Sequence, residues 1–159
     1  MPLYSIHGQA SLEVRHLVLD YNGNMATDGT LVPGVAERVR ELNLPPHELS
    51  VHVITADTMG TAQRQLEGLP CDLSILGPAE QDKAKLDFIQ GLGSAQTVAI
   101  GNGQNDHLML AVAALGIAVI GEEGAAAQTI LASRVVCRDI LSALDLLLKP
   151  KRLIATLRC

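Results

Sequence analysis

Short apolar runs alternate with amphipathic segments along this chain, and this alternation constrains its fold more than any other feature. Three of the runs are long and clear: 16–21 (HLVLDY), 50–55 (SVHVIT) and 96–101 (QTVAIG). Each leads, directly or after a turn, into a segment with helical periodicity. Alternating strands and helices are typical of an open parallel sheet with right-handed crossovers. The sequence therefore predicts an α/β fold: a doubly wound parallel sheet in three layers, with helices on both faces.

Weaker runs and helices complete the predicted order. We expect further strands at 71–76, 116–121 and 134–137. The segment 22–34 is rich in Gly, Asn, Asp and Thr, and we interpret it as turns or a small hairpin. The expected helices are 34–43, 58–67, 79–92, 105–114, 125–132 and 139–148, with a short last helix from Pro150.

Composition supports this fold class and argues against several functions. Hydrophobic residues are 48% of the chain but aromatic residues only 2%, so the core must be aliphatic, as in a sheet buried on both faces. A net charge of −5 argues against a nucleic-acid partner, because phosphate backbones recruit basic patches. No run approaches the roughly 20 apolar residues of a membrane span. The start of the chain also lacks the features of a signal peptide.

The length of 159 residues fits a single domain, so we expect one domain over 1–159. The three cysteines are widely spaced and form no CxxC pair. This pattern indicates neither a disulfide framework nor a zinc site. We therefore expect a reducing, cytoplasmic environment.

Residues that end the predicted strands are the candidates for function. In open parallel sheets, ligands bind beyond the carboxyl ends of the strands, where the strand order reverses. Asp20 follows an apolar strand, where a carboxylate could attack phosphorus and form an aspartyl phosphate, or could only cap a turn. Thr55 ends the second strand, where its hydroxyl could bind a phosphoryl oxygen or cap the next helix. Asp57 or Thr58 is interpreted as a helix cap.

The sharpest local pattern is GNGQND at 101–106, directly after the third clear strand. Its two glycines let the backbone turn tightly and approach a ligand. Asn102, Asn105 and Asp106 supply oxygen atoms suited to a hard cation such as Mg²⁺. The alternative is a polar loop in which Asn105 or Asp106 caps a helix.

In this chain order, the strand-end residues resemble the four motifs of the haloacid dehalogenase (HAD) superfamily. Asp20-Tyr21-Asn22-Gly23-Asn24 resembles the first motif, Thr55 the second, and 101–106 the GDGxND sequence of P-type ATPases. The third motif, a lysine that opens a helix, is best matched by Lys85, because KLDFI repeats a Lys-x-x-apolar-apolar spacing. Lys83 stays the alternative. The chain also resembles stand-alone soluble proteins that are similar to the phosphorylation domain of P-type ATPases.

The resemblance implies a Mg²⁺-dependent phosphohydrolase or phosphotransferase that acts through an aspartyl phosphate. The substrate would be a phosphorylated small molecule or macromolecule. The catalytic residues that the resemblance implies are Asp20 as nucleophile, Asn22, Thr55 and Lys85. The implied phosphate-binding residues are Thr55, Ala56, Lys85 and Asn105, and the implied Mg²⁺ ligands are Asp20, Asn22, Asn102 and Asp106.

Departures from the motifs affect the expected chemistry. Phosphatases of the family have an Asp at the position of Asn22, and an Asn cannot exchange a proton at neutral pH. General acid–base catalysis is worth about 10²–10⁴-fold, so we expect weak hydrolysis or a long-lived phosphoenzyme. Asn102 replaces the usual metal-binding Asp and leaves one fewer negative charge at the Mg²⁺ site. Asn24, in place of the motif's Thr, is a milder difference.

The spacing of the motifs leaves no room for a cap domain, because 35 positions separate Asp20 from Thr55 and 30 separate Thr55 from Lys85. The resulting open site suits a large substrate or one covered by a second subunit, so a homo-oligomer is a hypothesis. A competing interpretation is a non-catalytic regulatory module that binds Mg²⁺ and a phosphorylated ligand or partner. A third is an unrelated doubly wound domain, such as a receiver-like module.

Overall fold

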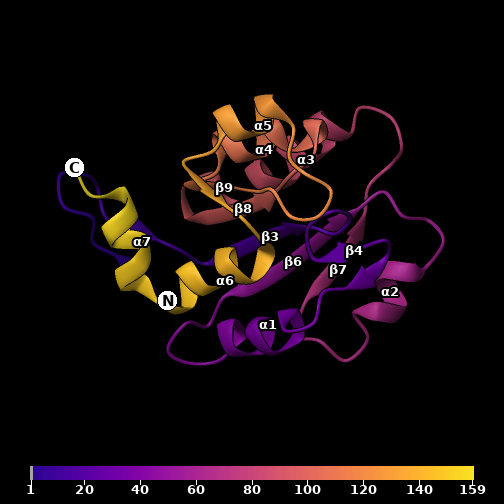
Figure 1. Cartoon of the computed structure of the whole chain (residues 1–159), viewed down its shortest axis with the longest axis horizontal. Coiled ribbons are helices and arrows are strands. Elements are labelled where there is room, and N and C mark those ends of the chain that lie inside the picture. The colour runs from indigo at the N-terminus through magenta and orange to yellow at the C-terminus, as the bar shows by residue number, and fades with distance from the viewer. Residues whose placement is uncertain (1) are drawn as a thin grey trace.

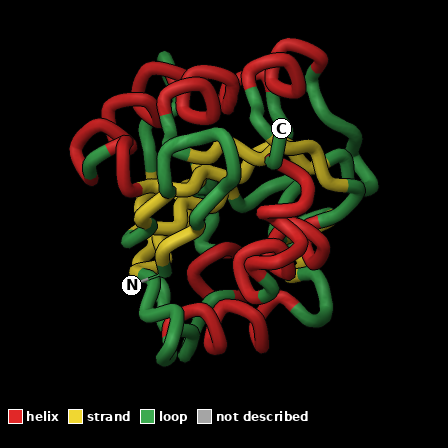
Figure 2. Tube along the Cα trace, turned by 90° about the vertical axis from the view of Figure 1, so that its left-hand side faces the viewer, coloured by secondary structure: helices red, strands yellow, loops and turns green. Residues whose placement is uncertain are grey.

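A six-stranded parallel sheet lies between two layers of helices in the computed structural model, which describes residues 2–159 (Figure 1, Figure 2). In chain order its strands are β3 (His16–Asp20), β6 (Ser50–Thr55), β7 (Asp72–Ile75), β8 (Thr97–Gly101), β9 (Leu115–Val119) and β10 (Val135–Cys137). The strand order across the sheet is β10-β9-β8-β3-β6-β7, and all neighbours run parallel. The predicted doubly wound sheet is confirmed.

Helices cover both faces of this sheet (Figure 1). One face carries α1 (Val35–Asn43), α6 (Ile140–Leu148) and α7 (Pro150–Leu157). The other face carries α3 (Gln81–Leu92), α4 (His107–Val112) and α5 (Ala127–Ala132). The short α2 (Thr61–Gln65) follows β6. Two 3-10 turns span Ser94–Gln96 and Gln104–Asp106.

Two apolar cores follow from the alternation of side chains along the strands. Leu17 and Leu19 of β3 belong to the core that includes α1 and α6. Val18, between them, belongs to the core that includes α3 and α4. Because β3 is buried on both faces, its sequence is a continuous apolar run rather than an alternating one, as is typical of parallel sheets.

The predicted elements differ from the structure mainly at their ends. The second helix, expected at 58–67, is shorter because the Asp57 carboxylate accepts the main-chain N–H groups of Met59 and Ala62 and holds a turn before α2. Asp57 thus supports the turn and the first turn of α2, although the N-cap position itself is Gly60. The helix expected at 105–114 begins as a 3-10 turn and ends at Val112.

Two small hairpins lie outside the main sheet. The segment 22–34 contains β4 (Ala26–Thr27) and β5 (Thr30–Leu31), as the turn residues predicted. The sequence did not predict β1 (Leu3–Tyr4) and β2 (Leu12–Glu13) near the start. Within residues 2–159 no cap domain interrupts the predicted motifs, and none of the helices is long and apolar enough to cross a membrane.

The strand order reverses beside β3. From β3 the chain continues outward to β6 and β7, then crosses to β8 on the other side of β3 and continues to β9 and β10. The carboxyl ends of β3 and β8 therefore meet at the topological switch point, where ligands of such sheets bind. This topology brings Asp20 next to the turn at 101–106.

Candidate active site

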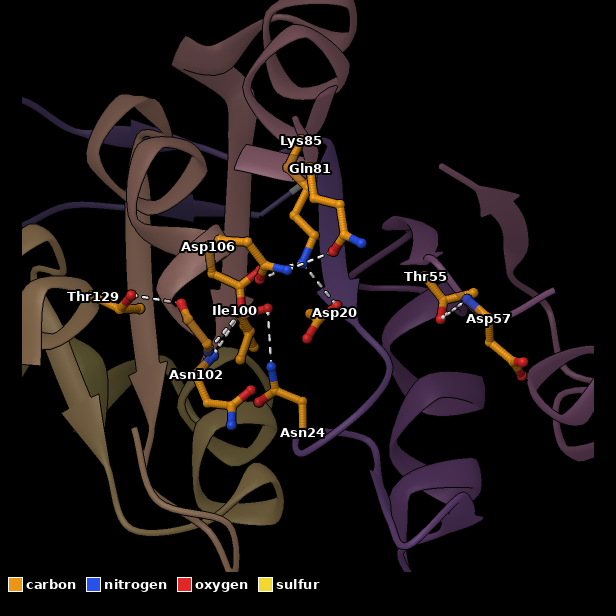
Figure 3. Close-up of polar contacts among 12 residues, drawn as sticks. Asp20, Asn24, Thr55, Asp57, Gln81, Lys85, Ile100, Asn102, Asp106 and Thr129 are labelled. Carbon is orange, nitrogen blue, oxygen red and sulfur yellow. Dashed lines mark hydrogen bonds and ion pairs between the residues drawn. The ribbon is translucent and has the colours of Figure 1, made fainter. Parts of the chain in front are cut away.

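A buried lysine joins the two strand ends at the switch point (Figure 3). Lys85 Nζ donates hydrogen bonds to Asp20 Oδ1 at 3.1 Å, to Asn105 Oδ1 at 3.0 Å and to Asp106 Oδ1 at 2.6 Å. The side chains of Lys85 and Asp106 are 3% and 0% exposed. Lys83 instead pairs with Glu80 at the surface. Of the two lysines that the sequence left open, Lys85 is the one that contacts Asp20.

This cluster contains two carboxylates and one ammonium group. Burial and the neighbouring Asp106 raise the pKa of Asp20 to about 7, although Lys85 acts in the opposite direction. Burial lowers the pKa of Lys85, but the adjacent carboxylates outweigh it and the pKa lies above its ordinary value. Negative charge therefore exceeds positive charge in a nearly dry site, and an added cation would stabilise the ionised form of Asp20.

Asp106 positions both the lysine and the turn after β8. Its Oδ2 atom accepts the main-chain N–H groups of Asn102 and Gly103, each at 2.9 Å. A Cβ atom on Gly101 would lie 2.6 Å from Asp106 Oδ2, so this approach requires glycine at 101. Metal ligation by Asp106, which the resemblance implied, stays a prediction. In the structure its carboxylate holds Lys85 and the turn.

Thr55 belongs to a separate group of residues on the neighbouring strand β6. Its hydroxyl accepts the main-chain N–H of Asp57 at 3.1 Å, away from the Lys85 cluster (Figure 3). The side chain of Asn22 is exposed. Asn22 and Ala56 line a cavity of about 420 Å³ that also borders Asp57. The hydrogen bonds of the structure thus bring together Asp20, Lys85, Asn105 and Asp106, whereas phosphate binding by Thr55 and Ala56 stays a prediction.

Two amide side chains present oxygen acceptors near the turn after β8. Asn102 Nδ2 donates to the Gly124 carbonyl at 3.0 Å, which turns its Oδ1 atom the other way. Asn24 Nδ2 donates to the Ile100 carbonyl at 3.4 Å, and its Oδ1 atom is buried without a hydrogen-bond partner among residues 2–159. In Figure 3 the two amide oxygens point toward one another. Acceptors that face each other without a donor suit a bound cation or water.

The donor set at this edge fits a hard divalent cation. The Asp20 carboxylate, the Asn102 amide oxygen and the main-chain carbonyl of Asn22 are all oxygen donors, which Mg²⁺ prefers. Among the described residues, no three His, Cys, Asp or Glu side chains gather as a metal site. Such a cation would therefore be held largely by amide, main-chain and water oxygens.

Two residues that support the site were not predicted from the sequence. Asn105 Nδ2 donates to Gln81 Oε1 at 2.6 Å, and Thr129 Oγ1 donates to the Gly103 carbonyl at 2.6 Å. Gln81 lies four residues before Lys85 on one face of α3, and this spacing could have identified it. Thr129 carries no such local signal, because it reaches the turn only through the packing of α5.

Solved structures with this architecture are phosphatases and related hydrolases. The 3-deoxy-D-manno-octulosonate 8-phosphate phosphatase of Moraxella catarrhalis, solved with magnesium, phosphate and KDO, has a TM-score of 0.72 and 16% identity over 91% of this chain and 94% of its own. A Legionella pneumophila protein assigned to HAD subfamily III A has a TM-score of 0.69 and 16% identity, over 92% of this chain and 88% of its own. The chain therefore has the same fold as these HAD-type hydrolases.

A second HAD phosphatase and one sequence relative complete the comparison. The cobalt-bound phosphatase YrbI of Haemophilus influenzae has a TM-score of 0.71 and 17% identity, over 88% of this chain and 90% of its own. The uncharacterized protein MJ0073 of Methanocaldococcus jannaschii is 52% identical over 79 residues, which cover 47% of this chain and 85% of that protein. This chain and MJ0073 therefore belong to one family, whose activity that name does not give. No family model matches the sequence.

Proposed function

We propose that this protein is a divalent-cation-dependent phosphohydrolase or phosphotransferase of HAD type that accepts a phosphoryl group on Asp20. The observation that carries the proposal is the buried Lys85 ammonium group, 3.1 Å from Asp20 Oδ1 at the switch point of the sheet. The HAD neighbours support it, since one was solved with magnesium and phosphate and another with cobalt. The proposed substrate is a phosphorylated small molecule or macromolecule, and the proposed cation is Mg²⁺.

In the proposed reaction a carboxylate oxygen of Asp20 attacks phosphorus in line with the leaving group. The bond between Asp20 and phosphorus forms as the bond from phosphorus to the leaving group breaks. Lys85 offsets the negative charge of the phosphoryl group and the two carboxylates, in a buried site where such interactions are strong. Thr55, Ala56 and Asn105 are the proposed partners of the phosphoryl oxygens.

The proposed cation is held by Asp20, the main-chain carbonyl of Asn22, Asn102 and Asp106. When bound, it supplies positive charge beside the phosphoryl oxygens. The unpartnered Oδ1 atom of Asn24 supports a cation in this region. The excess negative charge of the Lys85 cluster supports it too, because a cation would favour the ionised form of Asp20 that attacks.

Asn22 makes the proposed hydrolysis slow. Its amide cannot give a proton to the leaving group or take one from water. Substrates whose leaving group needs no proton, such as acyl or aryl phosphates, are therefore the favoured donors. Water then attacks the aspartyl phosphate slowly, so the phosphoenzyme persists. This persistence is the basis of the proposed likeness to P-type ATPases.

A second candidate is a regulatory module that binds a divalent cation and a phosphorylated ligand without turnover. The amide at Asn22 favours it, because the side chain faces solvent and has no acid–base function. For either function we propose a reducing compartment such as the cytoplasm, since the cysteines form no disulfide in residues 2–159. A homo-oligomer is part of the proposal, because a second subunit would cover the open cavity beside Asn22.

The test is mass spectrometry of the protein after incubation with acetyl phosphate and Mg²⁺. We expect one added phosphoryl group that depends on Mg²⁺, is released by hydroxylamine and is absent from the Asp20→Asn variant. Asp57→Asn is the matched control, because Asp57 lies at the same edge of the sheet but caps a turn. If wild-type protein binds Mg²⁺ but gains no phosphoryl group, the regulatory module becomes the better assignment.

A further inference from the structure

The loop after β9 is held by hydrogen bonds to Asn102, the residue that replaces the metal-binding Asp of the family. The main-chain N–H of Ala126 donates to the Asn102 carbonyl at 2.8 Å, and Asn102 Nδ2 donates to the Gly124 carbonyl at 3.0 Å. Asn102 therefore holds this loop through both its main chain and its side chain. An Asp at 102 would have no donor for the Gly124 carbonyl and would repel it. The loop carries two adjacent acidic residues, Glu122 and Glu123.

This attachment places the Glu123 carboxylate against the loop that follows Asp20. A Cβ atom on Gly23 would lie 2.6 Å from Glu123 Oε2 and 2.7 Å from Asn102 Nδ2. Gly23 also has a φ angle of 72°, in the left-handed region that favours glycine. Glycine at 23 thus permits both the turn and the close approach of Glu123 and Asn102. Glu122 lines a cavity of about 280 Å³ that also borders Gly23 and Asn24, but no atom of Glu122 is among the three nearest to a Cβ on Gly23.

A second observation in the same place is a buried oxygen acceptor that a cation or a water molecule would satisfy. Asn24, next to Gly23, is 3% exposed, and its Oδ1 atom has no hydrogen-bond partner in the described chain. Figure 3 shows this oxygen directed toward the side chain of Asn102. A buried acceptor without a donor is destabilising by about 1–3 kcal/mol unless water or an ion satisfies it. Glu123 therefore lies near a buried acceptor that lacks a donor in the described chain.

We infer that Glu123 supplies the negative charge that Asn102 lacks, as an outer-sphere partner of the divalent cation at Asp20. This inference rests on the proposed function, because it assumes a cation at Asp20. In this chain two residues share the roles of the usual Asp. Asn102 supplies an oxygen ligand and holds the loop, and Glu123 supplies the negative charge. An outer-sphere position agrees with the absence of three gathered acidic, His or Cys side chains in residues 2–159. It also suits Mg²⁺, which keeps several water molecules when bound.

The experiment measures Mn²⁺ binding by electron paramagnetic resonance, with Mg²⁺ as competitor, in the intact chain. Outer-sphere partners of a metal typically contribute 10–100-fold to affinity, so we expect Glu123→Gln to raise the Mn²⁺ Kd about 10-fold. Glu122→Gln is the matched control, because it removes the same charge from the same loop, and it should change the Kd less than about 2-fold. In an Asn102→Asp background, which returns the carboxylate to position 102, Glu123→Gln should lose most of its effect.

The outcomes separate this inference from the proposed function. Equal effects of the two glutamate variants, or an unchanged Kd in Glu123→Gln, overturn the inference and leave the phosphotransfer proposal standing if Asp20→Asn still abolishes binding. A wild-type protein with no saturable Mn²⁺ binding overturns the proposed cation site and the inference with it. A selective effect of Glu123→Gln on the Mn²⁺ Kd that disappears in the Asn102→Asp background supports the inference.

Discussion

Polar side chains form one cluster at each end of the central strands, and the two clusters differ in charge and burial. At the carboxyl ends, Lys85 bonds to Asp20 and Asp106, and all three side chains are nearly inaccessible to water. At the amino ends, His16 Nδ1 and His52 Nε2 lie 3.2 Å apart and are only partly buried. Ion pairs between buried charged groups hold the first cluster together, and a hydrogen bond between two imidazole rings holds the second.

The two histidines of the amino-end cluster are neutral, so the protein does not bear the free-energy cost of burying a charge there. Burial lowers the pKa of both rings, helped at His52 by His16, so both are mainly neutral at pH 7. One hydrogen bond joins them, and Phe88 packs edge-on against His52 at a ring distance of 5.9 Å. The carboxyl-end cluster keeps charged groups, because the Lys85–Asp106 ion pair stays ionised even when Asp20 is protonated. Retained charge therefore distinguishes the candidate-site end of the sheet from the histidine end.

The largest effect should come from Lys85→Met, which removes the ammonium group of the carboxyl-end cluster. Two buried carboxylates would then lack their partner. Breaking a buried ion pair costs about 3–5 kcal/mol, so we expect a loss of that size in the free energy of unfolding, measured by urea denaturation. The matched control is Lys83→Met, two residues away on the exposed face, which should change stability by less than about 0.5 kcal/mol. Similar losses in both variants would contradict the assignment of Lys85.

The next largest effect should come from Asn22→Asp, which adds the missing proton donor and acceptor at the carboxyl end. We expect hydrolysis of p-nitrophenyl phosphate to rise about 10²-fold, within the usual range of general acid–base catalysis. Steady-state kinetics with saturating Mg²⁺ would measure it, with Asn22→Ala as the control that adds no carboxylate. No gain while the cation still binds would mean that the site is not built for hydrolysis.

Asp20→Asn should remove the excess negative charge of the carboxyl-end cluster. The pKa of Asp20 in the folded wild-type protein, about 7, lies above the ordinary value of 3.8, so ionising Asp20 opposes folding. With EDTA present, the variant should therefore be more stable than wild type by about 1–2 kcal/mol at pH 8. This gain should shrink as the pH falls through 7 and vanish below 3.8, where Asp20 is protonated in both states. A loss of stability at pH 8 would show that Lys85 already neutralises Asp20.

The smallest effect concerns the histidine cluster. Both rings have a pKa below 6.5 in the folded state, so their contribution is present above that pH and is lost as the pH falls through the lowered values. We expect the protein to lose stability between pH 7 and 5, seen as a falling Tm. His52→Gln should reduce this loss, whereas His7→Gln, at an exposed position, should not. Equal pH profiles for both variants would rule out the pair as its source.

Several parts of the candidate site followed from local sequence patterns. Asp20 and the turn at 101–106 were predicted because apolar runs locate the ends of strands, and parallel strands present their carboxyl ends at one edge. The choice between Lys83 and Lys85 needed more than their spacing in the chain. Residues two apart on a helix differ by about 200° in direction, so only one of them can face the sheet. Lys85 is that residue, in phase with the buried Ile89 four positions later.

By itself, the sequence determined the strands and helices of the main sheet and the edge where the candidate site lies, because periodicity and strand ends are properties of neighbouring residues. Only the tertiary structure decided which side chains meet there. The crossovers bring Lys85 to Asp20, and the loop after β9 brings Glu123 to Gly23, across distances in the chain that no local pattern spans. The charge balance of the site also depended on the tertiary structure, because it follows from which ionisable groups are buried together.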